Sequence, residues 1–144
     1  MADPGPGTIA LVTRLSKAIG RRSTESLLGM RMRHLHVLSY LRDQQGMAQQ
    51  ELGEMLQMDP NNLVLLLNEL EAAGYTERHR DPGDRRRHRV ELTPVGRQAL
   101  EQGERAQETI EDEILGELST DEREALRRLL MKALRRHTGV APRA

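Results

Sequence analysis

The sequence predicts a single, mainly helical domain of the α+β class. Its apolar residues are Leu, Met, Ile, Val and Ala, with no Phe or Trp and only two Tyr in 144 residues. Leu, Met and Ala favour helices, whereas the aromatic residues that favour strands are almost missing. Apolar residues recur at helical spacing along most of the chain, and one basic segment instead resembles two strands around a Pro-Gly turn. A chain of this length can bury a substantial apolar core.

The N-terminal third predicts a short tail and two helices. Residues 1–7, "MADPGPG", are expected to be a disordered tail and not a signal peptide, because no basic region precedes an apolar one. Helical spacing then runs from Thr8 to about Arg22 and is interrupted near Gly29. A second helix is expected over 32–45, with Gly46 ending it.

Two short helices are expected next, with a tight turn between them. The first spans 48–57, and Ala48 stands where a capping Ser or Thr would be more stable by about 0.5–2 kcal/mol. The second spans 60–73, because Asp59 is a favourable N-cap residue and Pro60 suits the first helical position. Gly74 is placed to end this helix in the left-handed conformation.

A basic hairpin follows these helices. The segments 75–80 and 86–93 are strand-like, and "DPGD" at 81–84 has the Pro-Gly order of a type II turn. Residues 78–89 contain six Arg and two Asp, although the whole chain is formally neutral. Arg-rich strands are poor core material, so the ribbon should project into solvent.

The C-terminal part predicts two more helices. Thr93 and Pro94 form an N-cap and a first helical residue for a long helix that reaches about Leu118. Ser119 and Glu122 fit a capping box at the start of the last helix, which should fray around Gly139 and Pro142. Residues 101–124 contain ten Asp or Glu and two Arg, which is typical of a solvated helix face and balances the basic hairpin.

The order of these elements predicts a winged helix-turn-helix over residues 30–93. A helix that begins with Asn61 and Asn62 can enter the major groove, where the Asn amide matches the edge of adenine. An Arg-tipped ribbon can reach the adjacent minor groove, whose negative potential attracts guanidinium groups. We therefore predict double-stranded DNA as the partner. The candidate DNA-binding residues are Gln49, Gln50, Asn61, Asn62, Val64, Leu65, Arg78, Arg80, Asp84, Arg85, Arg86 and Arg87.

The segment from Gln49 to Gly96 resembles the MarR family of bacterial transcription regulators. Its most specific part is "RDPGDRRRHRVELTPVG", where Asp84 and Arg86 are followed by "LT" and Gly96. The resemblance implies that Arg86 contacts the minor groove. Residues two apart on a strand share a face, so Asp84 is expected to brace the Arg86 guanidinium, while Arg85 and Arg87 point to phosphates. The run "NNLVLLLNEL" departs from the family by placing Val64 and Leu65 where polar residues are usual.

The remaining helices are expected to form a dimerisation layer. Residues 8–29 and 94–138 carry more apolar stripe than a small winged helix can cover, which favours a two-fold homodimer reading half-sites about 10 bp apart on a pseudo-palindromic operator. The resemblance implies transcriptional regulation, most often repression, and release by a small aromatic or anionic effector. Arg14, His34 and Tyr40 are the candidate effector-pocket residues.

Composition removes several other classes of protein. The chain has no Cys, which excludes disulfides and thiol sensing. No apolar run approaches the roughly 18 residues needed to span a bilayer, so a cytoplasmic protein without a membrane partner is expected. No catalytic motif is present, so neither an enzyme nor a cofactor is predicted. Two alternatives stay open: a winged helix that binds an acidic protein instead of DNA, and a metal-responsive regulator. The histidines form no evident ligand set for a metal.

Overall fold

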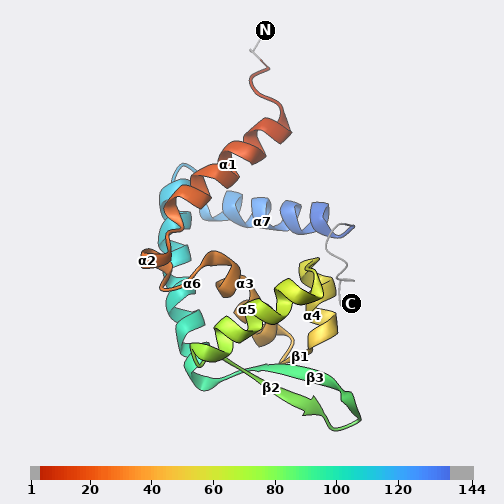
Figure 1. Cartoon of the computed structure of the whole chain (residues 1–144). Coiled ribbons are helices and arrows are strands. Elements are labelled where there is room, and N and C mark those ends of the chain that lie inside the picture. The colour runs from red at the N-terminus through yellow and green to blue at the C-terminus, as the bar shows by residue number, and fades with distance from the viewer. Residues whose placement is uncertain (1–3, 137–144) are drawn as a thin grey trace.

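The structure, a computed structural model that describes residues 4–136, is mainly helical with one small sheet, as the sequence predicts (Figure 1). It has the mainly α (α+β) class expected of a winged helix-turn-helix. The elements in chain order are α1 (Thr8–Arg22), α2 (Glu25–Leu28), α3 (Met32–Asp43), β1 (Met47–Ala48), α4 (Gln49–Leu56), α5 (Pro60–Ala72), β2 (Thr76–Asp81), β3 (Asp84–Leu92), α6 (Pro94–Ile114) and α7 (Thr120–Leu134).

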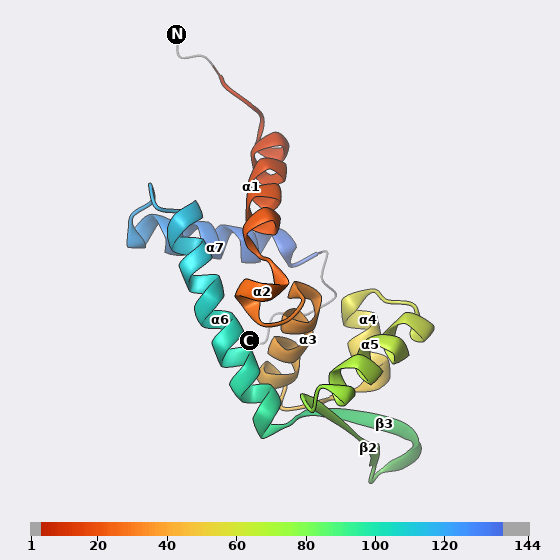
Figure 2. The same ribbon diagram turned by 60° about the vertical axis from the view of Figure 1, so that its left-hand side comes forward.

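One lobe is built from α3, α4, α5 and the sheet, and the long helix α6 leads away from it (Figure 2). α6 begins at the base of the hairpin, packs against α2 and α3, and contacts α1 at its far end. α7 follows α6 and lies with α1 at that end of the molecule (Figure 1). α6 therefore joins the sheet-containing lobe to a separate helical layer.

The apolar core lies almost entirely in the sheet-containing lobe. Its fully buried side chains are Leu35, Leu38, Leu41, Leu52, Leu67, Leu70, Leu100, Val37 and Val90. Eight of these nine come from α3, α4, α5 and β3, and Leu100 comes from the first part of α6. By contrast, neither α1 nor α7 contains a buried residue. The sheet-containing lobe thus buries its apolar side chains within itself and against α6, whereas α1 and α7 leave many of theirs exposed.

The sheet has three antiparallel strands in the order β1-β3-β2. β2 and β3 form the predicted hairpin, which projects from the lobe (Figure 1). β1 was not predicted, because a strand of two residues shows no periodicity in the sequence. It exists through tertiary pairing, with Met47 opposite Val90 and Ala48 opposite Arg89.

Several local predictions need correction. The hairpin turn is not type II, because Gly83 does not adopt the positive φ that this turn requires. Instead, the Asp81 carboxylate accepts a hydrogen bond from the Gly83 N–H at 2.9 Å. Asp59 occupies the N-cap position of α5, but its side chain makes no capping hydrogen bond. The short helix α2 was also missed, because its four residues are too few for a periodic pattern.

Other helix ends follow the sequence closely. Ser119 and Glu122 form the predicted capping box, with hydrogen bonds of 3.2 and 2.9 Å. Ala48 is the N-cap residue of α4 and, as expected, provides no side-chain cap. α6 ends at Ile114, four residues before the predicted end. The predicted frayed end at Gly139 and Pro142 and the first three residues of the predicted tail lie outside the described residues. Across residues 4–136, no helix is both long and apolar enough to cross a bilayer.

Candidate nucleic-acid interface

The helix α5 turns two different faces to the core and to solvent. Its four buried side chains, all Leu, anchor it in the lobe; they are Leu63, Leu66, Leu67 and Leu70. The predicted residues Asn61, Asn62, Val64 and Leu65 are all exposed, and Leu65 keeps 60% of its surface. The solvent face of α5 is therefore a ridge of two amides and two aliphatic side chains, which suits hydrogen bonding to base edges and contact with thymine methyl groups.

Several predicted residues meet around one open hollow between α4, α5 and β3. This hollow has a volume of about 520 Å³ and is called the wing hollow here. Its lining includes Gln49, Gln50, Val64, Arg86 and Arg87, which the sequence had singled out individually. His88 also lines it and was not predicted, because a His between arginines gives no separate signal. Polar side chains of α4 and cationic side chains of β3 thus face a common surface, to which α5 contributes apolar side chains.

The tip of the hairpin carries the free positive charge. Arg80, Arg85 and Arg86 are exposed, and their guanidinium groups have no protein partner in the part of the chain that the structure describes. Asp84 does not brace the Arg86 guanidinium as predicted. Its carboxylate accepts from the Arg86 backbone N–H at 3.0 Å and lies 3.9 Å from Nε of Arg87. A short acidic side chain next to a turn reaches the nearby backbone more easily than a side chain two residues away.

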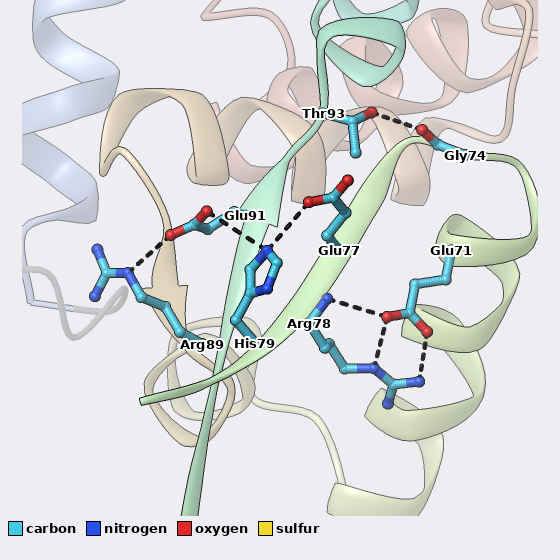
Figure 3. Close-up of polar contacts among 8 residues, drawn as sticks. All are labelled: Glu71, Gly74, Glu77, Arg78, His79, Arg89, Glu91 and Thr93. Atoms are coloured by element: carbon cyan, nitrogen blue, oxygen red, sulfur yellow. Dashed lines mark hydrogen bonds and ion pairs between the residues drawn. The ribbon is translucent and has the colours of Figure 1, made fainter. Parts of the chain in front are cut away.

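Arg78 has a structural partner on α5 (Figure 3). Its Nε and Nη2 atoms donate to the two carboxylate oxygens of Glu71 at 3.1 and 2.7 Å, and its backbone N–H donates to Glu71 at 3.1 Å. Nη2 also donates to Asn68 at 2.6 Å. The sequence placed Arg78 among the DNA-binding residues, but the structure engages its guanidinium in joining β2 to α5. This pair fixes the hairpin relative to the helix that it follows.

The Arg78 guanidinium, by hydrogen bonding to Glu71, lowers the pKa of that carboxyl below its ordinary value of 4.5. A carboxyl group with a lowered folded-state pKa stabilises the fold above its unfolded pKa, and this contribution is lost as the pH falls below about 4.5. We expect Glu71→Gln to lower the free energy of unfolding at pH 7 by about 1–2 kcal/mol. The difference from wild type should shrink toward pH 3 in urea titrations. Equal differences at both pH values would contradict this role.

The base of the hairpin is closed by Thr93. Its Oγ1 donates to the Gly74 carbonyl oxygen at 2.6 Å (Figure 3) and accepts from the Gly96 N–H at 3.0 Å as the N-cap of α6. Its backbone N–H donates to the Tyr75 carbonyl oxygen at 3.0 Å. One residue thereby connects the end of α5, the start of β2 and the start of α6.

The three predicted effector-pocket residues lie in different surroundings. Arg14 is exposed on α1, and Tyr40 packs against the core from α3. His34 has its Nε2 atom 2.9 Å from a carboxylate oxygen of Glu69. Within residues 4–136, no group of three or more His, Asp or Glu side chains is placed to hold a metal ion.

Comparison with known proteins identifies this combination of helix pair and basic hairpin. Residues 30–88 match the MarR family model. The chain is 30% identical over 131 residues to a putative transcriptional regulatory protein for the hcr operon of Thauera aromatica, covering 90% of this chain and 75% of that protein. The chain belongs to the MarR family. It is also 30% identical over 122 residues to the HTH-type transcriptional regulator YdgJ of Bacillus subtilis, covering 85% of this chain and 71% of that regulator.

Solved MarR structures share the fold over most of the chain. The apo form of wild-type Escherichia coli MarR superposes with a TM-score of 0.77 at 26% identity, covering 92% of this chain and 99% of that one. A mutant of E. coli MarR complexed with operator DNA gives a TM-score of 0.72 at 28% identity, covering 87% and 91%. This MarR-family protein is thus a transcriptional regulator with a DNA-binding winged helix.

Proposed function

We propose that this MarR-family protein represses transcription as a homodimer bound to a pseudo-palindromic operator. The observation that carries the proposal is the arrangement of the α5 ridge beside the wing hollow, with free guanidinium groups at the hairpin tip. In this arrangement α5 reads the major groove and the hairpin, acting as the wing, reaches the adjacent minor groove. A repressor that occupies such a site blocks the promoter by its presence, so no further activity is needed.

The uncovered helical layer supports the homodimer. Large apolar side chains are exposed along α1 and α7; they are Ile9, Leu11, Val12, Ile19, Leu129, Leu130, Met131 and Leu134. Both helices border a hollow of about 330 Å³ on α6, with Leu15, Ile110 and Leu126 in its lining. Large apolar side chains exposed together on two helices that line one hollow are normally covered by a partner. A second copy of the chain supplies a matching apolar surface through two-fold symmetry.

The wing assignment is tested with Arg86→Ala. We expect the variant to lose about 1–3 kcal/mol of DNA-binding free energy, because the Arg86 guanidinium is free at the hairpin tip and lines the wing hollow beside α5. Binding sites should first be selected from random DNA with the wild-type protein, and affinities then measured by fluorescence anisotropy. Arg105→Ala, which removes the same charge from the middle of α6, is the control and should bind as wild type. Equal affinities for all three proteins would refute the wing assignment.

The same DNA titrations test the alternative that the winged helix binds a protein. If the winged helix serves protein contact instead, the wild-type chain will show negligible affinity for every DNA even at low salt.

Release by a small aromatic or anionic effector stays a prediction, and a thermal-shift screen with phenolic acids tests it. An effector would act by changing the distance between the two DNA-binding lobes, since affinity for two half-sites depends on their spacing.

A further inference from the structure

A second hollow lies on the opposite side of the α5 ridge. Its volume is about 310 Å³, and we call it the α3 hollow because the start of α3 forms one wall. The α5 ridge separates the two hollows, with Val64 lining the wing hollow and Leu65 lining the α3 hollow. The complete lining of the α3 hollow is Arg31, Arg33, His34, Asn62, Leu65, Leu66 and Glu69. The predicted DNA-binding residues on α5 therefore lie between two hollows.

The α3 hollow contains uncompensated positive charge. Arg31 and Arg33 are both exposed, and neither guanidinium has an ion pair or hydrogen-bond partner among the described residues. The carboxylate in the hollow, Glu69, is engaged by the His34 ring at 2.9 Å. Two cations beside one partnered carboxylate leave a net positive surface. Such a surface fits an anionic partner.

The geometry of the major groove decides what that partner is. A helix in this groove, which is about 12 Å wide, lies between two phosphate backbones. With the α5 ridge in the groove, the wing hollow faces one backbone and the α3 hollow faces the other. We propose that Arg31 and Arg33 bind phosphates of that second backbone. This inference rests on the proposed function and extends the DNA surface from the wing and α4 to the start of α3.

The composition of α5 explains what phosphate contacts by Arg31 and Arg33 would contribute to DNA binding. Val64 and Leu65 on the ridge form no hydrogen bonds to bases, so α5 has few directional contacts of its own. Phosphate contacts fix the register and orientation of a protein on the duplex. Cationic residues on both sides of α5 hold the helix at a defined depth and rotation in the groove. Phosphate contacts on one side alone would leave the helix free to rotate. Asn62, next to these arginines, is then positioned for base contact.

The test is the double variant Arg31→Ala/Arg33→Ala. Each phosphate contact contributes about 0.9 to the slope of log affinity against log salt, so a dimer that loses two per copy should lose about 4 from this slope. Affinity near 0.1 M salt should fall by about 100-fold or more. The loss should be similar on the selected operator and on unrelated DNA, because phosphates carry no sequence information. Anisotropy titrations at several salt concentrations measure all of these quantities.

Two further variants make the result decisive. Arg31→Lys/Arg33→Lys keeps the charge and should retain most of the salt dependence, while Arg105→Ala should leave it unchanged. If the double Ala variant keeps the wild-type slope while Arg86→Ala still weakens binding, this inference fails and the proposed function stands. A loss confined to the selected operator would also overturn it, since that pattern indicates base contacts. Absence of DNA binding by the wild-type protein would refute both proposals.

Discussion

Replacing Gly96 with Ala is expected to destabilise the protein by about 3 kcal/mol. Gly96 is buried in the first turn of α6, and a Cβ atom there would collide with the Tyr75 carbonyl oxygen and lie 2.9 Å from its carbonyl carbon. The colliding carbonyl group of Tyr75 belongs to the backbone, so no side-chain rotation relieves the collision. α6 must instead move away from the start of β2. Urea unfolding followed by circular dichroism measures the loss.

Two other glycines provide graded controls for this prediction. A Cβ on Gly103 would collide with Leu35 Cδ1, the end of a side chain, so Gly103→Ala should cost less than Gly96→Ala. A Cβ on Gly20 meets nothing within 4 Å, and Gly20→Ala should leave stability unchanged or raise it by up to about 1 kcal/mol through helix propensity. A Gly96→Ala variant as stable as wild type would show that the α6 start and β2 are not rigidly packed.

The same substitution should affect DNA binding, because Gly96 lies at the joint between the wing and the helical layer. Thr93 fixes the wing base to α6 through its bonds to Gly74, Tyr75 and Gly96. If α6 shifts, these bonds must stretch or break. The wing then loses its position relative to α5, although no residue that we propose to contact DNA has changed.

The sequence identified the fold because its local signals are strong and agree with one another. Pro60, Pro94 and the Ser119 capping box each mark a helix start that the structure contains. Apolar spacing places the four buried Leu of α5 on one face and leaves Val64 and Leu65 outside. Elements that depend on tertiary pairing gave no such signal, which is why β1 was missed.

The site was harder to predict than the fold, because a charge in the sequence does not reveal its partner. Arg78 and Arg86 look equivalent in the basic segment, yet Arg78 bonds to Glu71 on α5 while the Arg86 guanidinium is free. Arg31 and Arg33 gave no signal for the opposite reason. They lie far from the basic hairpin in sequence, and only the packing of the start of α3 beside α5 brings them next to Asn62 and Leu65.

The largest effect on function is expected from the double variant Leu129→Glu/Leu130→Glu on α7. These side chains are 61% and 42% exposed, so charging them costs the folded monomer less than charging a buried side chain would. In the proposed dimer they are buried against the second copy, where two carboxylates per chain would be desolvated without partners. The variant should be monomeric in sedimentation velocity. Because one lobe then binds one half-site alone, operator affinity should fall by about 100-fold to 10,000-fold.

The control for this variant is Arg128→Ala/Lys132→Ala, which lies on a different stripe of α7. It changes the net charge by −2, as the double Glu variant does, so any general electrostatic effect on DNA affinity is the same in both. It should remain dimeric and bind the operator close to wild type. If the Glu variant stays dimeric with full affinity, α7 is not the interface. If it becomes monomeric yet binds the operator as tightly as wild type, each lobe recognises its site independently, and the proposed paired reading of half-sites is wrong.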